Sequence, residues 1–488
     1  MLFSSSIFLF NFLPITLFIY YVFLRNTKQL KNYFLLIMSL IFYAWGEPKF
    51  VIMLIFSIII NWFCGLLIDK KRNNKKICKL LIVLTLMSNL SVLLVFKYLG
   101  FLVTNLNSIF SFNLTVPQIA LPIGISFFTF QAISYVIDVY RGNGKVQKNI
   151  LNVGLYLAFF PQLIAGPIVR YETIAEQINN RKENFEDFSK GTYRFLIGLF
   201  KKVLISNQMA LVANIAFDGN PTSVLLAWLC AIAYALQIYF DFSGYSDMAI
   251  GLGSMFGFKF EENFDYPYTS KSITEFWRRW HMSLTSWFRD YLYIPLGGNR
   301  KGKIRKHMNT MIVFLVSGLW HGAGWNFIIW GGLNGFYIVC QDLTKNFRKQ
   351  IYERLHINTN GFIFKWIARI AVFLMIDFSW LFFRVESLGT AMEMLSIMIK
   401  DFQISRLLDY QFWGNFITAE SLVLLVLLIL IAAFADYLKY KNINMVQKVL
   451  EQPWIVRWII YYVLLAAILF LGAYGEGYEQ TQFIYFQF

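Results

Sequence analysis

The sequence predicts an all-α protein that crosses a membrane many times. Of its 488 residues, 57% are hydrophobic and 19% are aromatic, whereas only 15% are charged. A soluble globular protein has about a quarter of its residues charged. The chain also contains many apolar runs of about 20 residues, the length that a helix needs to cross a bilayer core of about 30 Å. These observations argue against a soluble enzyme, a disordered chain and a disulfide-stapled secreted domain.

The apolar runs predict a bundle of about eleven to thirteen spanning or re-entrant helices. The clearest candidate spans are residues 7–24, 33–48, 51–68, 80–96, 119–139, 150–168, 225–240, 365–383, 421–439 and 456–473. Weaker candidates are residues 98–113, 191–215, 243–258 and part of 308–341. Because the sequence shows no internal repeat and no low-complexity linker, we expect a single membrane domain over residues 1–488.

Basic residues set the expected orientation of the chain. Lys and Arg number 44 against 28 Asp and Glu, which gives a formal net charge of +16. The excess gathers in four clusters beside apolar runs, at residues 25–31, 70–79, 300–306 and 345–354. Short loops rich in Lys and Arg stay on the cytoplasmic side, so we expect the N-terminus outside the cell membrane and residues 7–24 retained as the first span. We interpret the charge as loop anchors rather than as a nucleic-acid-binding surface.

The segment 308–340 is predicted to form a broken or re-entrant helix pair. It contains no Asp, Glu, Lys or Arg, and as one helix it would be ~50 Å long, too long for a ~30 Å core. Since the basic clusters on both sides should stay cytoplasmic, we expect a bend at Gly322–Ala323–Gly324. Non-helical backbone at membrane depth is tolerated only inside protein or beside water, so the bend predicts an internal cavity near His321.

His321 is the first candidate catalytic residue. It lies deep in the predicted membrane domain, between Ser317 and Trp325, and an ionisable residue at such depth indicates a functional site. A neutral imidazole can remove a proton from a hydroxyl near neutral pH. The glycines that flank it would let a substrate approach the backbone closely. The alternative is a neutral core histidine that is hydrogen-bonded to a backbone carbonyl.

His281 is the second candidate. Ser272 and Glu275 have the spacing of a capping box, so we expect a helix to begin there. If that helix continues, Trp277 and His281 are four residues apart on one face, with Phe288 further along. The neighbouring arginines could contact phosphate or carboxylate groups. The alternative is an amphipathic helix on the cytoplasmic surface whose arginines reach into water.

The remaining ionisable residues have plainer interpretations. We expect His307 and His356 to be solvated. The basic cluster 300–306 could attract a polyanionic donor such as coenzyme A, although an orienting anchor is the simpler explanation. Three acids lie in apolar runs, where a buried hydrogen-bonding role is commoner than catalysis. These acids are Asp241, Asp247 and Asp377.

Several familiar motifs are absent from the sequence. The four cysteines lie far apart, with no C-x-x-C and no histidine at metal-ligand spacing, so we expect no metal site. The sequence has no Walker A motif, no dinucleotide-binding loop and no G-x-S-x-G elbow. ATP-driven transport and a self-contained serine hydrolase are therefore poorly supported.

Five long motifs resemble the membrane-bound O-acyltransferase family, and more narrowly its alginate O-acetylation branch. They are DFSGYSDMAIGLG at 241–253, ENFDYPY at 262–268, FWRRWH at 276–281, WFRDYLYIPLGGN at 287–299 and GLWH at 318–321. PQLIAGPIVR at 161–170 and FIYFQF at 483–488 fit the same branch. The resemblance extends over essentially the whole chain, and the motifs are rich in Trp, Tyr and His, which makes chance agreement improbable.

The resemblance implies a helical bundle around a central cavity, with a catalytic core at about residues 119–341 and peripheral helices over 1–113 and 362–488. It implies that His321 is catalytic and that His281 is a second active-site residue. It also implies no permanently bound cofactor, acetyl-CoA as a co-substrate entering from the cytoplasm, and an extracellular partner acetyltransferase of the SGNH-hydrolase type.

We therefore expect an enzyme that passes acetyl groups across the membrane for O-acetylation of an exported polysaccharide, such as alginate or cellulose. His321 would act as the base, and His281 would position it or donate a hydrogen bond to the developing oxyanion or the departing thiolate. Three alternatives stay open: a D-alanyl transferase for teichoic acid, a transporter of lipid-linked sugars, and a non-catalytic membrane scaffold.

Overall fold

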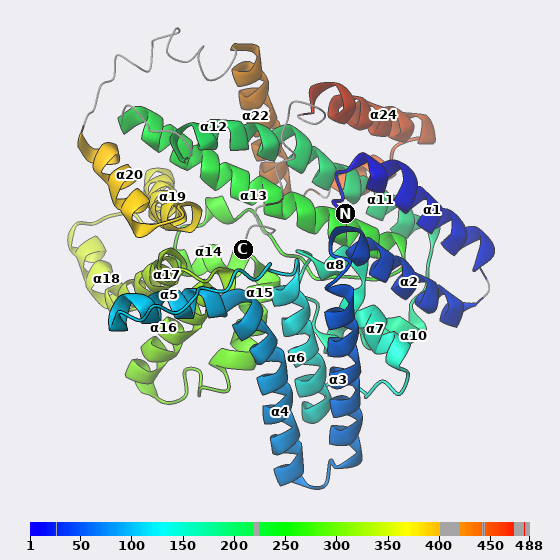
Figure 1. Cartoon of the computed structure of the whole chain (residues 1–488). Coiled ribbons are helices and arrows are strands. Elements are labelled where there is room, and N and C mark those ends of the chain that lie inside the picture. The colour runs from blue at the N-terminus through cyan, green and yellow to red at the C-terminus, as the bar shows by residue number, and fades with distance from the viewer. Residues whose placement is uncertain are drawn as a thin grey trace. The chain divides into compact units, whose positions relative to one another are not determined.

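The computed structural model describes residues 1–25, 27–217, 224–400, 419–441, 443, 445–472 and 483. In these residues all regular structure is helical, as the sequence predicts (Figure 1). The chain divides into two compact units. The first unit comprises Met1–Leu199 and Tyr245–Glu261, and the second comprises Phe200–Gly244 and Glu262–Phe488. Of the predicted motif at 483–488, only Phe483 lies within the described residues.

The first unit contains the N-terminal helices, in which η marks a π-helical segment. In chain order they are η1 (Phe8–Phe12), α1 (Leu13–Phe18), η2 (Ile19–Phe23), α2 (Lys28–Gly46), α3 (Val51–Lys70), α4 (Lys75–Leu93), η3 (Leu94–Tyr98), α5 (Leu99–Phe110), α6 (Ile125–Arg141), α7 (Ile150–Ala158), α8 (Phe160–Leu163), α9 (Tyr171–Ile174), α10 (Gln177–Asn180) and α11 (Phe185–Phe200). Helices α3, α4 and α6 lie side by side (Figure 1).

The second unit contains the helices that carry both candidate histidines. In chain order they are η4 (Lys201–Ser206), α12 (Asn207–Phe217), the first part of α13 (Val224–Met255), the 3₁₀ turn η5 (Pro267–Thr269), α14 (Ile273–Arg279), α15 (Met282–Phe288), η6 (Arg289–Tyr293), α16 (Gly302–His321), α17 (Trp325–Leu343), α18 (Lys345–Arg354), α19 (Phe362–Arg384), α20 (Leu388–Lys400), α22 (Ala419–Tyr440), α23 (Met445–Leu450) and α24 (Trp454–Leu471).

Six helices of the described chain are long and apolar enough to cross a membrane, so the protein is a multi-pass membrane protein. They are Val51–Lys70, Lys75–Phe110, Phe185–Ile215, Leu226–Met255, Phe362–Arg384 and Trp454–Leu471. A shorter apolar helix covers Phe8–Phe23. Some predicted spans merge, because the weaker candidate 98–113 continues α4 and the candidate 243–258 continues α13.

The predicted span at 150–168 is wrong. Helix α7 ends at Ala158, Phe159 has an extended ψ of 113°, and the four-residue helix α8 follows. Pro161 explains the break, because proline has no backbone N–H and its ring would clash with the carbonyl of Leu157 in a continuous helix. Residues 152–168 are nevertheless buried, which accounts for the apolar composition of this part of the chain.

Helices α4 and α5 form one continuous run that bends at η3. Figure 1 shows α5 turning away from the axis of α4. Lys97 lies in η3, and its Nζ donates a hydrogen bond to Ser126 Oγ at 3.3 Å. Both α4 and α5 expose many apolar side chains, as expected of helices that face lipid.

The glycines near the end of α13 serve helix packing. A Cβ on Gly251 would stand 2.6 Å from the carbonyl oxygen of Gly191 in α11, so only glycine permits this approach. Gly257 has a φ of +79° and turns the chain directly after α13. The glycine-rich pattern at 251–257 is therefore a packing and helix-end feature, in agreement with its unsuitable spacing for a nucleotide loop.

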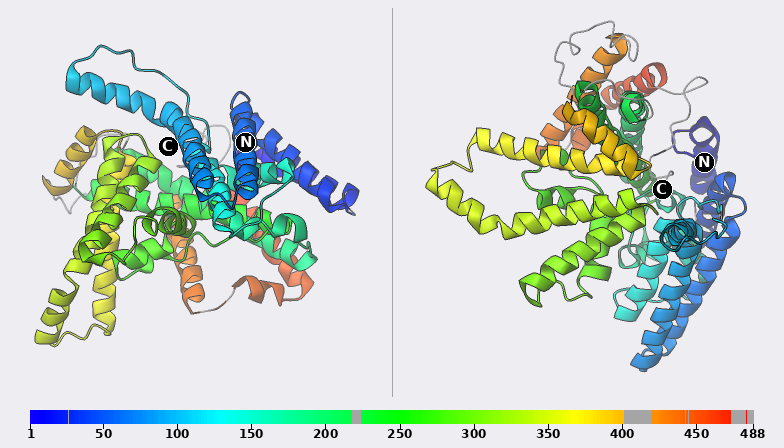
Figure 2. Two further views of the ribbon diagram at one scale, coloured as in Figure 1. Left: turned by 90° about the horizontal axis from the view of Figure 1, so that it is seen from below. Right: turned by 60° about the vertical axis from the view of Figure 1, so that its left-hand side comes forward.

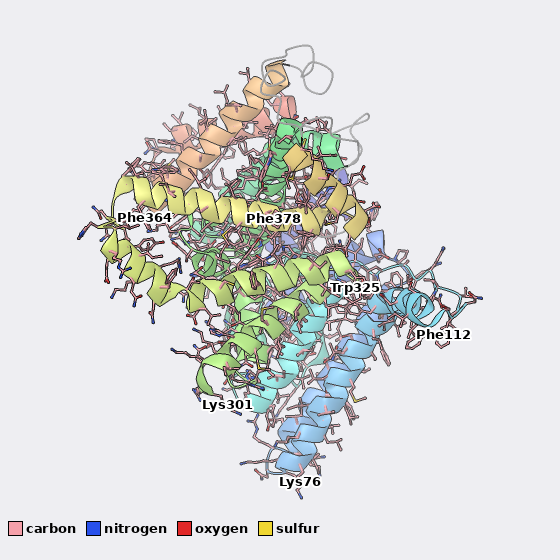
Figure 3. All side chains as sticks on the ribbon, turned by 90° about the vertical axis from the view of Figure 1, so that its left-hand side faces the viewer. Lys76, Phe112, Lys301, Trp325, Phe364 and Phe378 are labelled. Atoms are coloured by element: carbon pink, nitrogen blue, oxygen red, sulfur yellow. The ribbon has the colours of Figure 1, made fainter. Side chains whose placement is uncertain are left out.

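Helices α16 and α17 form the predicted hairpin. Helix α16 ends at His321, and Gly322 and Gly324 are extended, with φ values of −162° and −160°. The two helices lie side by side in both views of Figure 2, and Figure 3 shows Lys301 and Trp325 at opposite ends of the pair. The crossing is close, because a Cβ on Gly318 or Gly331 would overlap a backbone oxygen of the facing helix.

Candidate functional site

His321 lies at the end of α16 and is 4% exposed. Its ring packs against three aromatic side chains in T-shaped arrangements. The ring centroids of Trp320, Trp330 and Phe383 lie 4.8, 5.0 and 5.1 Å from that of His321. Trp330 comes from α17 and Phe383 from α19, so three helices fix the position of the imidazole.

The glycines beside His321 accommodate protein rather than open space. A Cβ on Gly322 would overlap the ring of Phe327, and one on Gly318 would overlap the Phe327 carbonyl. The expectation that these glycines leave room for a substrate is therefore wrong for both positions. They let α17 fold back tightly against α16, which brings Trp330 to His321. The internal cavity near His321 stays a prediction.

His281 does not lie on a continuous helix with Trp277, so the predicted shared face is wrong. The predicted cap is confirmed, because the Glu275 backbone N–H donates to Ser272 Oγ at 3.1 Å, whereas the Glu275 carboxylate accepts from the Lys271 backbone N–H rather than from that of Ser272. Helix α14 ends at Arg279, however, and His281 adopts the left-handed conformation with φ 45° and ψ 54°. Positive φ is uncommon outside glycine, although histidine is among the residues that tolerate it.

The segment around Asn263 explains why α14 ends there. The Asp265 backbone N–H donates to the Arg279 carbonyl at 3.0 Å, and the Met282 backbone N–H donates to the Asn263 carbonyl at 3.0 Å. These bonds satisfy backbone groups that a longer helix would have used itself. These tertiary hydrogen bonds override the local helical pattern. The sequence of residues 272–288 alone could not predict them, because the partners lie outside that segment.

The side chain of Asn263 also contacts His281 directly. Asn263 is 1% exposed, and its Oδ1 lies 3.1 Å from His281 Nδ1. The same oxygen accepts hydrogen bonds from the Ser283 backbone N–H at 3.3 Å and from Ser283 Oγ at 2.9 Å. Sequence reasoning missed this role, although Asn263 stands in a motif that carries the family resemblance.

The two candidate histidines are linked through one indole ring. The centroid of the Trp320 ring lies 6.2 Å from that of His281 and 4.8 Å from that of His321. Phe242 packs its ring at 88° to His281, 4.6 Å away. His281 is 1% exposed, and burial lowers its pKa to about 3. The structure thus brings both predicted residues into one buried aromatic site, with His281 neutral.

A layer of tryptophans lies next to these rings. Trp330 stacks on Trp380 with centroids 5.8 Å apart and meets Trp277 at 5.7 Å. Trp280 lies 5.0 Å from Trp380. Trp280, Trp330 and Trp380 are each 1% exposed. This layer surrounds the imidazoles with apolar surface and limits the access of bulk water to them.

His307 is partly buried and paired with an acid, whereas we expected a fully solvated side chain. Its Nε2 lies 2.9 Å from Asp342 Oδ2, and Lys306 Nζ lies 2.7 Å from the same oxygen. The hydrogen bonds from His307 and Lys306 hold the pKa of the Asp342 carboxyl below its usual value. This cluster joins the start of α16 to the end of α17. His356 is exposed, as predicted.

Two of the three acids in apolar runs have basic partners. Asp241 forms an ion pair with Lys202 at 2.5 Å, and both side chains are almost fully buried. Asp247 pairs with Arg194 at 2.9 Å. Both acids therefore have the structural role that was expected of them. Asp377 is 1% exposed in α19, and neither of its carboxylate oxygens has a hydrogen-bond partner among the described residues.

The acidic and basic side chains outside this aromatic site form no candidate metal centre among the described residues. Within the described ranges, no three His, Cys, Asp or Glu side chains are grouped so that they could hold a metal ion. Arg300, Lys301 and Lys303 are exposed before and at the start of α16. These side chains could bind a polyanion, but their arrangement does not indicate which polyanion.

Comparison with known proteins shows which family the chain resembles. A model of the membrane-bound O-acyltransferase family matches residues 145–384, a range that contains His281, His321 and Phe383. The probable alginate O-acetylase of Pseudomonas putida is 40% identical over 100% of both chains. The peptidoglycan O-acetyltransferase of Helicobacter pylori is 36% identical over 82% of this chain and 80% of its own.

A third relative is more distant. The teichoic acid D-alanyltransferase of Bacillus subtilis is 30% identical over 52% of this chain and 66% of its own length. Taken with the helical fold and the buried histidines, these similarities show that the chain belongs to the membrane-bound O-acyltransferase family. It is an O-acyltransferase embedded in the membrane.

Proposed function

We propose that the protein transfers acetyl groups from acetyl-CoA for the O-acetylation of an exported polysaccharide. The observation that carries this proposal is the buried site in which the Trp320 ring contacts both His281 and His321. The names of relatives that cover most of this chain, alginate O-acetylase and peptidoglycan O-acetyltransferase, support acetyl as the acyl group and a cell-surface polymer as the final acceptor.

In the proposed reaction His321 acts as the general base. Its neutral imidazole takes the proton of an acceptor hydroxyl, and the oxygen attacks the thioester carbonyl of acetyl-CoA. The C–S bond breaks as the tetrahedral intermediate collapses, and the coenzyme A thiolate takes the proton from the imidazolium. One C–O ester bond replaces one thioester bond, and the histidine returns to its neutral form. The acceptor hydroxyl belongs to a sugar or to a side chain of a partner protein.

The aromatic surroundings support acyl transfer rather than hydrolysis. Trp320, Trp330 and Phe383 pack around the His321 ring and leave it 4% exposed. Limited access of water protects a thioester from wasteful hydrolysis and strengthens the electrostatic interactions within the site. Histidine at this position therefore has an environment in which a bound hydroxyl competes well with solvent.

The proposal includes a direction of transfer. Acetyl-CoA approaches from the cytoplasm, where the basic cluster 300–306 attracts its phosphates. The acetyl group leaves on the outer side, where an extracellular SGNH-type acetyltransferase passes it to the polymer. The N-terminus lies outside the cell membrane in this arrangement, and the catalytic core covers about residues 119–341 of a single domain.

The decisive experiment replaces the proposed base. We expect His321→Ala to lower transfer of [¹⁴C]acetyl from acetyl-CoA into base-labile esters by at least ~100-fold, because a general base contributes roughly 10²–10⁴-fold. The assay uses membrane vesicles from cells that carry the chain, normalised to the amount of inserted protein. His356→Ala is the matched control, because His356 is exposed and should leave the rate unchanged.

The same variants separate the alternatives. Full acetylation by His321→Ala, or by a His281/His321 double alanine variant, would refute the catalytic assignment and favour a scaffold. Reduced polymer export with unchanged acetyl content would favour a transporter. Ester-linked alanine in place of acetate would favour D-alanyl transfer, for which the lower identity to the teichoic acid enzyme gives less support.

A further inference from the structure

The side chain of Asn263 lies against one ring nitrogen of His281. Asn263 Oδ1 has three neighbours within hydrogen-bonding distance: His281 Nδ1, the Ser283 backbone nitrogen and Ser283 Oγ. All three residues are 1% exposed, so water does not compete for these contacts.

The Ser283 backbone identifies the amide atom that faces His281. A backbone N–H can only donate, so the asparagine atom that it meets must be the carbonyl oxygen and not the NH₂ group. That oxygen can only accept. His281 Nδ1 must therefore be the donor in the 3.1 Å contact and must carry the ring proton.

We infer that Asn263 is a positioning residue that holds His281 as the Nδ1–H tautomer and so leaves Nε2 as the accepting nitrogen of the active site. This inference rests on the proposed acetyltransferase function. It changes the role expected of His281, because a neutral ring with its proton on Nδ1 cannot donate from Nε2 to an oxyanion or a thiolate. His281 instead accepts a hydrogen bond from a substrate hydroxyl, or orients a neighbouring donor.

The backbone shows that Asn263 positions His281 in a second way. His281 has a φ of 45°, a conformation that a non-glycine residue adopts only when its surroundings hold it. Asn263 supplies two of these restraints, because its carbonyl accepts from the Met282 N–H and its side chain contacts the His281 ring. One residue thus fixes both the backbone turn and the ring orientation.

Burial agrees with a neutral ring. The low pKa of His281, about 3, arises from desolvation, and a neutral imidazole has one donor and one acceptor nitrogen. An aspartate at position 263 would present a negative charge to Nδ1–H and would favour the imidazolium, which has no acceptor nitrogen. Asn263→Asp should therefore make the rate of acetyl transfer depend more strongly on pH. A variant that only loses packing would lower the rate equally at every pH.

The test compares Asn263→Asp with the wild type in the vesicle assay with [¹⁴C]acetyl-CoA, from pH 5 to pH 8 with equal pH on both sides. A raised His281 pKa means that the acceptor nitrogen is present at high pH and is lost as the pH falls through the new value. We expect the ratio of the rates at pH 8 and pH 5 to rise by about threefold or more relative to the wild type.

Ser283→Ala is the matched control, because it removes the hydrogen bond from Ser283 Oγ to the same oxygen while leaving Asn263 uncharged. Its pH profile should match the wild type. An unshifted profile in Asn263→Asp, or an equal shift in Ser283→Ala, would overturn the inference. Absence of acetyl transfer by the wild-type protein would instead defeat the proposed function, so the two failures are distinguishable.

A measurement on the unaltered chain covers the case in which Asn263→Asp does not fold. The sequence contains only four histidines, so ¹⁵N-histidine labelling of the lipid-embedded protein gives a simple solid-state NMR spectrum. The signal that disappears in His281→Gln should show a protonated Nδ1 and an unprotonated Nε2. The opposite tautomer, or an imidazolium at pH 7, contradicts the proposal.

Discussion

At the residue scale, the contacts of His321 extend beyond the segment in which it was recognised. Phe383 of α19 packs against the imidazole and also meets Phe327, Trp330 and Trp380, with centroid distances of 5.3, 5.1 and 5.4 Å. A single ring thus supports the histidine and the tryptophan layer together. We therefore expect Phe383 to position His321, although the sequence of α19 alone resembles an ordinary apolar span.

Phe383→Leu should therefore lower the rate of acetyl transfer by about tenfold, because small displacements of a catalytic group have large effects on rate. The Michaelis constant for acetyl-CoA should change by less than about twofold, since the mutated side chain supports the histidine rather than the donor. Steady-state kinetics in lipid vesicles measure both quantities.

Phe382→Leu is the comparison variant for this prediction. Phe382 is 8% exposed and contacts Phe378 of its own helix, at a centroid distance of 5.7 Å. An equal loss of rate in both variants would indicate a general defect of α19 and would contradict the positioning role of Phe383.

Sequence reasoning selected His321 from its depth in an apolar segment, and family motifs indicated both His281 and His321; the structure brings both rings into contact with Trp320. It misjudged His307, because the pairing with Asp342 joins residues that only the hairpin brings together. It also missed Asn263 and Phe383. Amide and phenyl side chains occur in many structural roles, so their types carry no signal of function until the fold places them against an imidazole.

At the scale of elements, the α16–α17 hairpin depends on two glycines that face each other. The Cα of Gly331 would lie 3.4 Å from a Cβ on Gly318, and each glycine meets a backbone carbonyl of the partner helix. Backbones this close gain packing and dispersion energy that larger residues would prevent. The hairpin in turn carries His321, Trp330 and the Asp342 cluster.

Gly331→Ala should destabilise the protein by about 1–3 kcal/mol, because its Cβ overlaps the carbonyl oxygen of Phe314 and overpacking costs energy of that order. Gly332→Ala should be neutral or slightly stabilising, since its Cβ makes an ordinary 3.5 Å contact with Leu315 and alanine favours helix. Thermal unfolding in detergent compares the two. Equal unfolding temperatures would show that the glycine crossing has no special role.

The hairpin bend was predictable and the end of α14 was not. The bend at Gly322–Gly324 follows from the length of an uncharged segment between two basic clusters, which are properties of the chain itself. Helix α14 begins at the predicted cap, but its end depends on hydrogen bonds from residues 263–265. These residues lie in the irregular segment between α13 and η5, where the sequence has no periodic pattern that would predict their hydrogen bonds. Pro161 could have predicted the break after α7, but the apolar composition of the segment favoured a continuous span.

At the scale of the whole molecule, composition was the most reliable guide. The low fraction of charged residues predicted a helical membrane protein, and six long apolar helices in the described chain agree with it. Apolar content alone did not distinguish helices that face lipid from helices buried in protein. The expected number of spans therefore included largely buried segments such as 150–168. The orientation in the membrane depends on the basic clusters and can be tested directly.

Cysteine labelling tests the orientation. In a variant with Cys64, Cys78, Cys230 and Cys340 replaced by alanine, Lys303→Cys should react with a membrane-impermeant maleimide only in inside-out vesicles. Ser6→Cys, which is also exposed, should react only in right-side-out vesicles. Labelling of both positions from the same side would contradict the predicted orientation.

The bend between α4 and α5 has a consequence for the lipid environment. Lys76 near the start of α4 and Lys97 in η3 are separated by about 32 Å along a helix, close to the ~30 Å hydrocarbon thickness of a typical bilayer. A thicker bilayer would surround the bend at η3 with acyl chains, whereas a thinner one would leave apolar side chains of α4 in water. Hydrophobic mismatch in either direction would strain the bend, so we expect the protein to be most stable in phospholipids whose acyl chains match that separation.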